Sequence, residues 1–194
     1  MPSPSVLRGS FGTKRFVLKS LNVLEALRAT DGWRHDEAIL NGLFQSPRPK
    51  SRLRWLVEGP IPRSPRRFTY SITPIGESRP IGAHAVKLSG YRSAFGTVAL
   101  HDRAWWGKDV VVEAKAMLMN QFFRHAGIER FYGVVDAHNV ASVFSYRKLG
   151  FTHCGTWHRH KQNPVTGEVI DYLFFEMFRE QWQAGPFWEA EDGH

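Results

Sequence analysis

The residues with the clearest potential for chemistry lie in "TVALHDRAWWGKDVVVEA" (residues 97–114), where an apolar strand pattern runs into a helical one. A helix N-terminus presents unpaired backbone N–H groups and a partial positive charge, which together suit a pyrophosphate. Gly107 lets the backbone approach a phosphate closely, and Lys108 adds charge. Gly-Lys at a helix start is also compatible with an ordinary helix cap, so this turn alone is a weak signal.

Asp109 introduces a conflict into this turn, because it places a carboxylate where a phosphate would bind. Two like charges a few ångströms apart repel each other. An aspartate in a first helical turn is otherwise favourable, since it interacts well with the helix dipole. The carboxylate therefore either weakens phosphate binding or has a purely structural role.

A second segment, "NVASVFSYRKLGF" (residues 139–151), brings further polar side chains. Asn139 is expected to cap a short helix over 140–149, which Gly150 ends. Tyr146 could donate a proton, or could be a core aromatic on this helix. Ser142 could cap the helix, contact a ligand or allow close packing.

The elements that must position these segments follow from hydrophobic periodicity. We expect a strand at 14–21, short helices at 22–30 and 36–44, and a hairpin over 66–90, followed by a strand at 93–102. A long helix from Val110 to Phe123 has two apolar stripes, a strand follows at 130–137, and a long hairpin closes the chain over 151–178. The strand-helix-strand order in the second half predicts a parallel crossover. The fold class is α/β (α+β): a mixed sheet with helices on both faces.

These two segments, in this order and at this separation, resemble the GNAT superfamily of acyl-CoA-dependent N-acyltransferases. Within it they are similar to the Rim-type branch, the ribosomal-protein N-terminal acetyltransferases. The matching residues are Trp105, Trp106, Gly107, Lys108, Glu113, Ala114, Asn139, Ser142, Lys148, Gly150, Phe151, Gly155, Gly167, Asp171 and Trp182. The resemblance covers residues 97 to 182 and implies a GNAT-like, mostly antiparallel sheet with a splayed parallel pair.

The resemblance implies direct transfer of an acyl group, most simply acetyl, from acyl-CoA to a primary amine, without a metal. The residues that match the family's donor site are Val98, Ala99, Leu100, Trp105, Trp106, Gly107, Lys108, Asp109, Val110, Asn139, Ser142 and Lys148. Family members usually have Gly or Ala at the position of Asp109. In this family, backbone N–H groups of the strand before the turn stabilise the tetrahedral intermediate.

Three catalytic candidates follow, one acid and two bases. Tyr146 stands seven residues after Asn139, where many superfamily members place a catalytic tyrosine that protonates the departing thiolate. The Rim-type branch often has an aliphatic residue there. His101 is a candidate general base, because histidine titrates near neutrality, although a lone histidine is more often structural. His158 is a second candidate base, and His158 with His160 gives poor evidence for a metal.

Bulk composition bounds the remaining expectations. The 194 residues suit a single acyltransferase domain, with a core over 8–182 and a loosely held tail at 183–194. One cysteine, Cys154, fits a reducing cytoplasm and is expected to be a small buried hydrophobe. No signal-peptide or membrane-spanning segment is expected, so the protein should be cytoplasmic.

The net charge of +8 indicates anionic partners without naming them. The basic residues of 46–55 and 62–68 are expected to form a proline-rich surface loop. Three hypotheses remain open: an enzyme that uses acyl-CoA, an enzyme whose donor is an acidic acyl-carrier protein, and a non-catalytic module with weakened CoA binding. The acceptor would be a small amine or a protein N-terminus, a homodimer stays open, and nucleic acid is not expected.

Overall fold

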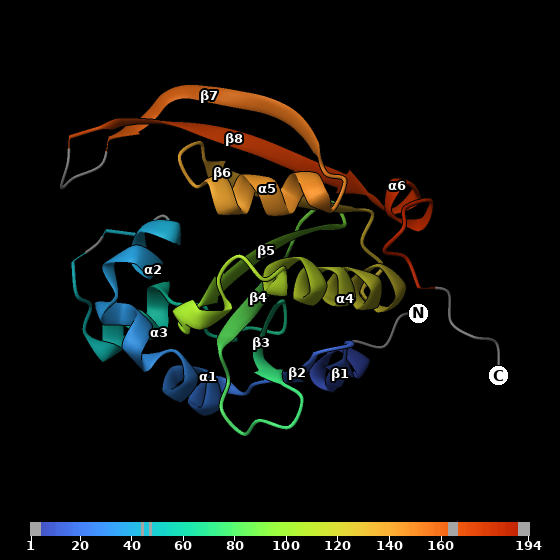
Figure 1. The fold of residues 1–194 in the computed structure, drawn as a ribbon, viewed down its shortest axis with the longest axis horizontal. Coiled ribbons are helices and arrows are strands. Elements are labelled where there is room, and N and C mark those ends of the chain that lie inside the picture. Colours follow the sequence, from blue (N-terminus) through green and yellow to red (C-terminus); the bar gives the residue numbers. More distant parts are fainter. Residues whose placement is uncertain (1–4, 44, 47, 163–166, 190–194) are drawn as a thin grey trace.

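A computed structural model describes residues 5–43, 45–46, 48–162 and 167–189. Its centre is one eight-stranded sheet of order β1-β2-β3-β4-β5-β6-β8-β7 (Figure 1). The strands are β1 (Ser10–Gly12), β2 (Phe16–Ser20), β3 (Arg67–Pro74), β4 (Gly82–Ser89), β5 (Ser93–Leu100), β6 (Arg130–Asp136), β7 (Thr152–Gln162) and β8 (Val169–Phe178). Neighbouring strands are antiparallel except β5 and β6, which are parallel. The predicted fold class is confirmed.

The helices divide between the two faces of the sheet. One face carries α1 (Val23–Ala29), the 3₁₀ turn η2 (Asp31–His35), α2 (Glu37–Gly42) and α3 (Arg52–Glu58), which gather at one end of the molecule (Figure 1). The other carries α4 (Val110–His125), next to α5 (Val140–Lys148). Two further 3₁₀ turns, η1 (Val6–Arg8) and η3 (Arg103–Trp105), and the short helix α6 (Arg179–Gln183) complete the described elements. Side-chain caps from Asn22, Asp36, Ser51 and Asn139 begin four of the helices.

The long helix is buried as its periodicity predicts. Along α4, both apolar stripes are buried except Val111, which is half-buried. Two polar residues, Lys115 and Asn120, are also buried on this helix. Asn120 is satisfied by α6 and the segment after it, whereas Lys115 lies beside the parallel strand pair.

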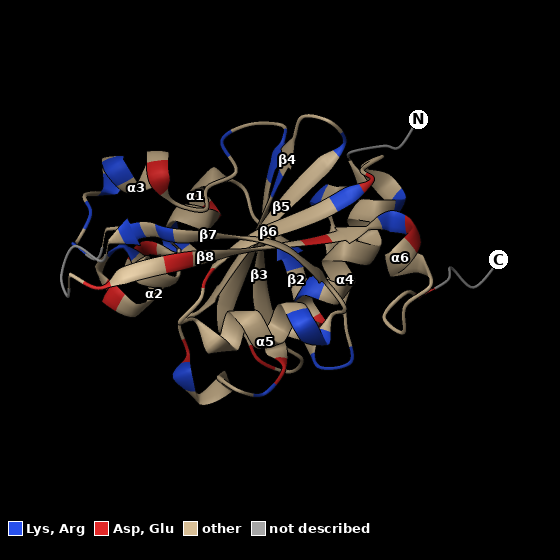
Figure 2. Cartoon of the chain, turned by 90° about the horizontal axis from the view of Figure 1, so that it is seen from above, with Lys and Arg blue, Asp and Glu red and all other residues tan. Residues whose placement is uncertain are grey.

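The expectation of a basic surface loop over 46–55 and 62–68 was wrong from Arg52, where the helix α3 begins. Residues 48–51 and 62–66 lie outside helices and strands, as expected. Trp55 of α3 is fully buried, and its Nε1 donates to Thr30 Oγ1 at 2.9 Å. The basic side chains are paired as well: Lys50 and Arg54 bind Glu58, and Arg52 binds Asp31. Figure 2 shows acidic next to basic positions on α3. Burial of one indole and neutralisation of three cations explain why this proline-flanked segment folds.

The expectation of a loose tail from residue 183 was also wrong, as far as residue 189. Asn120 Oδ1 accepts a hydrogen bond from Trp182 Nε1 at 2.7 Å, and its Nδ2 donates to the Phe187 carbonyl at 3.0 Å. The Phe187 ring stacks on Trp182, and Arg124 lies over Trp188. A buried asparagine on α4 thus ties down the chain after α6, because its polar atoms need partners.

Cys154 is exposed, which corrects its expected burial. It lies on β7, an edge strand of the sheet, whose one partner among the described residues is β8. This strand is irregular between Trp157 and Lys161, where Arg159 has φ +52°. The hairpin is confirmed, but its expected turn at residues 163–166 lies outside the described residues. That 1–194 is a single domain stays a prediction.

Candidate active site

The site begins where the parallel strands separate. β5 and β6 pair only at Ser93–Arg130, Ala94–Phe131 and Phe95–Tyr132. From Gly96 to Leu100, β5 keeps its partner β4 but has no strand on its other side among the described residues. The gap opens toward the carboxyl ends of the two strands, which is where ligands bind in sheets with parallel connections.

A cavity of about 690 Å³ occupies the open end of this gap. Its walls are the end of β5 (98–100), the turn and first residues of α4 (105–111), and α5 with its cap (139–142 and 144–145). Ala38, Ile39 and Gly42 of α2 form the fourth wall. The volume is within the usual range for small-molecule sites. We call this space the donor cavity.

Almost all of the sequence-predicted donor residues line this cavity. They are Val98, Ala99, Leu100, Trp105, Trp106, Gly107, Lys108, Asp109, Val110, Asn139 and Ser142. Lys148 is absent from the lining, and Tyr146 lines an adjoining cavity instead. The structure therefore brings the two motif segments together, although their role in binding stays a prediction.

The turn before α4 has the shape of an anion cradle. Gly107 has φ +72°, a left-handed conformation that favours glycine, and a Cβ there would meet no other atom within 4 Å. Trp106 Nε1 donates to the Leu100 carbonyl at 3.1 Å, which ties the turn to the end of β5. Lys108 Nζ lies 5.5 Å from the centre of the Trp105 ring. The backbone at the start of α4 thus faces the donor cavity.

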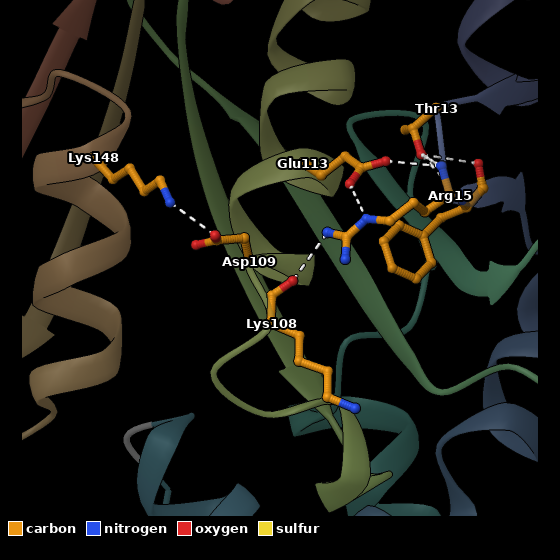
Figure 3. Close-up of polar contacts among 7 residues, drawn as sticks. Thr13, Arg15, Lys108, Asp109, Glu113 and Lys148 are labelled. Carbon is orange, nitrogen blue, oxygen red and sulfur yellow. Dashed lines mark hydrogen bonds and ion pairs between the residues drawn. The ribbon is translucent and has the colours of Figure 1, made fainter.

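A distant segment clamps this turn (Figure 3). Arg15, between β1 and β2, donates from Nε to Glu113 Oε2 at 2.7 Å and from Nη2 to the Lys108 carbonyl at 2.9 Å. The Arg15 backbone N–H also donates to Glu113 Oε1 at 3.0 Å. Glu113, part of the Glu-Ala motif, therefore holds the helix start against the first hairpin. The contacts with Arg15 and Thr13 lower the pKa of its carboxyl group, against the effect of burial.

The Asp109 carboxylate is turned toward α5 and neutralised there. Lys148 Nζ lies 2.8 Å from Asp109 Oδ2 (Figure 3). Asp109 itself is the N-cap of α4 with φ +58°, a conformation that aspartate tolerates better than most residues other than glycine. Its side chain makes no capping hydrogen bond. Asp109 thus takes the backbone conformation that glycine would supply, and Lys148 offsets much of its charge.

We predict that Asp109→Gly tightens CoA binding about tenfold, because it removes both the carboxylate and the left-handed strain and frees Lys148 for phosphate. Titration calorimetry at two salt concentrations measures this effect. Asp109→Asn, which keeps the tolerance for this backbone conformation, separates charge from strain. Weaker binding by both variants would show that the pair with Lys148 is needed to shape the turn.

Asn139 has the capping role expected from its position. Its Oδ1 accepts a hydrogen bond from the Ser142 backbone N–H at 3.0 Å. The same side chain borders the donor cavity near Gly42 of α2. The two readings of Asn139, helix cap and ligand contact, are therefore compatible.

Tyr146 is buried at the closed end of the gap. One face of its ring stacks on Phe175 with centroids 5.1 Å apart, and Phe151 packs edge-on. Its hydroxyl lies against Gly133 of β6, where a Cβ would be only 2.0 Å away. Burial raises the pKa of the phenol well above its ordinary value, so the hydroxyl carries its proton at neutral pH. Tyr146 lines a second cavity of about 80 Å³, the junction cavity, which shares six residues with the donor cavity: Gly42, Val98, Val111, Asn139, Ser142 and Ser145.

Gly133→Ala should displace the Tyr146 hydroxyl, because the new methyl group would occupy its space. We expect a loss of about 1–3 kcal/mol in the free energy of unfolding, typical of overpacking, and a large loss of turnover. Denaturant unfolding and an acetyl-transfer assay measure the two effects. Gly155→Ala is the matched control, because a Cβ there meets nothing within 4 Å. Full activity in Gly133→Ala would mean that the position of the hydroxyl is unimportant.

The histidines proposed from the sequence as bases or metal ligands lie away from Tyr146 and the junction cavity. His101 is exposed beyond the end of β5, where its Nδ1 accepts a hydrogen bond from Trp33 Nε1 at 3.4 Å. It is four residues past Thr97 of the junction cavity, about 13 Å along a strand. His158 pairs with Asp171 at 2.9 Å on the hairpin, and His160 packs on Trp157 and Tyr172. In the described ranges, no three His, Cys, Asp or Glu side chains could hold a metal ion together.

Several residues at the site were missed from the sequence. The wall from α2 has no motif, because its contribution depends on packing across the sheet. Gly133 and His84 lie on strands as unremarkable small or polar residues. Lys115 did carry a signal: it stands four residues after Val111 and four before Met119, on the buried side of the helix.

The chain belongs to the GNAT acetyltransferase family. The family model for the acetyltransferase (GNAT) domain matches residues 23–152. No curated protein matches the chain. The described residues contain no helix with the length and apolar character needed to span a bilayer.

Solved structures with the same fold include Rim-type enzymes, in agreement with the resemblance seen in the sequence. One is RimL, the ribosomal L7/L12 α-N-protein acetyltransferase, in complex with coenzyme A (TM-score 0.71, 17% identity, 87% of this chain and 97% of that one). Another is the ribosomal-protein-S5-alanine acetyltransferase of Vibrio fischeri (TM-score 0.67, 17% identity, 89% and 98%). A third is a GNAT-family acetyltransferase from Bacillus anthracis (TM-score 0.69, 13% identity, 88% and 99%).

Proposed function

We propose that this protein transfers an acetyl group from acetyl-CoA to a primary amine by direct attack. The observation that carries the proposal is the continuity of the donor and junction cavities, which leads from the turn at Gly107 to the Tyr146 side chain. A donor with a phosphate at one end and a thioester at the other fits this order of groups. Membership of the GNAT family supports the choice of acetyl-CoA.

The donor's pyrophosphate would lie at the backbone N–H groups of residues 107–110, where the dipole of α4 favours negative charge. The pantetheine arm would follow the unpaired side of β5 from Leu100 to Val98, next to Asn139. The thioester would then reach the junction cavity. The RimL structure with the same fold holds coenzyme A, which supports this assignment by analogy.

The chemistry needs three contributions from the chain. The attacking amine must lose a proton, the developing oxyanion needs N–H donors, and the thiolate must gain a proton. The unpaired edge of β5 supplies backbone donors near Val98. The Tyr146 hydroxyl, protonated and held at the closed end of the gap, supplies the proton for the thiolate.

The acceptor would approach from the α2–α3 side. A third cavity of about 250 Å³, the acceptor cavity, shares Leu43, Phe95 and Thr97 with the junction cavity. It lies between the segment after α3 and the strands β3 to β5. An open cavity of this size fits a small amine or the first residues of a protein N-terminus. Two Rim-type enzymes with this fold act on ribosomal proteins, which supports the second choice by analogy.

A free CoA donor is favoured over an acidic carrier protein. The carrier hypothesis depended on the charge of Asp109 and on a free basic loop. Asp109 is paired with Lys148, and Lys50, Arg52 and Arg54 are paired with carboxylates. The argument from Asp109 therefore loses most of its weight, also for a non-catalytic module, and the argument from the basic segment loses its weight for residues 50–54.

An acetyl-transfer assay with a panel of amines tests the proposal. Purified protein is incubated with acetyl-CoA and spermidine, L-lysine, or peptides with free N-terminal Ala or Ser, and free thiol is followed over time. We expect amine-dependent release of CoA and an acetylated product by mass spectrometry. If no amine in the panel, including the protein N-termini, becomes acetylated, the assignment as an acetyltransferase for these acceptors fails.

A further inference from the structure

Lys115 is a buried titratable residue that the proposed mechanism leaves unused. It lies in the middle of α4 with 5% of its surface exposed. It lines the junction cavity and also a small inner cavity of about 10 Å³. The titratable residues lining these two cavities besides Lys115 are His84 of β4, Tyr132 of β6 and Tyr146 of α5, and none of them is a carboxylate.

Lys115 and Tyr146 form a pair. Lys115 Nζ lies 3.7 Å from the centre of the Tyr146 ring. Stacking on Phe175 and the edge contact with Phe151 fix the orientation of this ring. The pair borders the junction cavity together with Thr97 and Val111. An ammonium or amine at this position is therefore next to both the candidate acid and the space where the thioester would be attacked.

The surroundings of Lys115 favour its neutral form. Burial lowers the pKa of its amine to about 7. His84, on the other side, has both ring nitrogens buried without a hydrogen-bond partner in the part of the chain that the structure describes. Burial and the nearby Lys115 lower the pKa of His84 to about 3. The histidine stays neutral near pH 7 and offers Lys115 no negative charge.

We propose that Lys115 is the general base that takes the proton from the attacking amine, with Tyr146 as the general acid beside it. This inference rests on the proposed acetyl transfer. A neutral amine that titrates close to the working pH is well suited to accept a proton in a transition state. Lys115 lines the junction cavity, which shares lining residues with both the donor and the acceptor cavity.

The proton balance closes within the pair. The acceptor nitrogen attacks the thioester carbon and forms the C–N bond, and its proton passes to Lys115 Nζ directly or through one water. The C–S bond then breaks, and the Tyr146 hydroxyl gives its proton to the departing sulfur. Lys115 is left as an ammonium beside a Tyr146 phenolate, and transfer of one proton from Nζ to the phenolate oxygen restores both residues.

Two other candidate bases are less well placed. His101 lies about 13 Å of strand away from Thr97. The Glu58 carboxylate borders the acceptor cavity, but Lys50 and Arg54 hold it at 2.8 and 2.7 Å, which lowers its pKa and so its basicity. Lys115 has no such anchoring partner among the contacts described for it.

Three variants separate a general base from a charge or packing role. Lys115→Met keeps an unbranched side chain one atom shorter and removes the proton acceptor. Lys115→Arg keeps a cation near Tyr146 but cannot accept a proton, because arginine stays protonated. Lys19→Met, an exposed lysine on β2, is the control. Kinetics use acetyl-CoA with the panel amine that the wild type acetylates fastest, and thermal melts verify that each variant is folded.

We expect Lys115→Met and Lys115→Arg each to lower kcat/KM for the amine about 100-fold, with unchanged CoA binding. The acidic limb of the wild-type pH profile, near pH 7, should be lost in both. The double variant Lys115→Met/Tyr146→Phe should lower kcat/KM by less than the product of the two single-variant factors, because the two side chains act as one unit. Wild-type activity in Lys115→Met, or full activity in Lys115→Arg, would overturn the inference.

An NMR titration of the lysines tests the inference without an activity assay, so that its result does not depend on how well a variant turns over. In ¹³C NMR of ε-labelled lysine, one resonance should titrate near neutrality and should be missing in Lys115→Met. If every lysine titrates above pH 9, the inference fails while acetyl transfer can still stand. If the wild type acetylates no panel amine, the proposed function fails instead, and the NMR titration still reports on Lys115 itself.

Discussion

Tyr146→Phe is expected to lower kcat about 100-fold, with little change in the affinity for CoA. The substitution removes only the hydroxyl that would protonate the departing thiolate, and loss of a general acid costs this order of magnitude. The ring contacts with Phe175 and Phe151 remain available to phenylalanine. The phenol carries its proton at neutral pH, because burial raises its pKa.

The control for Tyr146→Phe is the same substitution at a second buried tyrosine. Tyr70 is fully buried on β3, and its hydroxyl donates to the Leu7 carbonyl, away from the three cavities. Tyr70→Phe should therefore lower stability without lowering kcat. Steady-state rates with saturating acetyl-CoA, together with calorimetric CoA binding, measure both variants. An unchanged kcat in Tyr146→Phe would remove this residue from the mechanism.

Lys115→Met is expected to stabilise the protein at neutral and acidic pH, because the buried amine destabilises the wild type there. A catalytic role for Lys115 explains why the wild type retains this unfavourable residue. The native pKa of Lys115 is about 7 and the ordinary value is 10.5. As the pH falls from 10.5 to 7, the unfolded chain takes up a proton that the native protein does not, so wild-type stability falls through this window. Below pH 7 the penalty is constant at about 5 kcal/mol.

His84 adds a second window at lower pH. Its native pKa of about 3 lies below the ordinary 6.5, so stability falls again as the pH drops from 6.5 to 3. Urea unfolding of the wild type, Lys115→Met and His84→Met from pH 4 to pH 10 resolves the two contributions. The excess stability of Lys115→Met should appear between pH 10 and pH 7 and then level off. An excess that is the same at every pH would assign the gain to packing alone.

Local sequence signals predicted most of the fold. Asn139 caps its helix as expected, Asn22 and Asp36 begin the two short helices expected at 22–30 and 36–44, and the apolar stripes of α4 are buried. The failures have a common cause, which is burial that depends on distant partners. Residues 52–58 form a helix because Trp55 is buried and hydrogen-bonded to Thr30, which is distant in sequence. The chain after α6 is held in place by hydrogen bonds to Asn120 of α4. Cys154 is exposed because β7 is an edge strand, which no local pattern reveals.

The candidate site was predictable where it is made of motifs. The turn at Gly107 and the cap at Asn139 come together across the splayed strands, as the resemblance implied. What could not be predicted is how side chains meet across elements. Asp109 is neutralised by a lysine thirty-nine residues away in sequence, and Tyr146 meets Lys115 from another helix. Pairings of this kind depend on tertiary geometry, which spacing along one chain does not encode.

Calorimetric titration of CoA into the wild type and into Gly107→Asp tests the central claim most directly. The account predicts one CoA bound per chain, with a Kd of roughly 10 µM, and loss of binding when a carboxylate replaces the open backbone of the turn. Gly155→Asp, on the exposed edge strand, should bind like the wild type. Absence of CoA binding by the wild type, or equal binding by Gly107→Asp, would contradict a donor site at this turn.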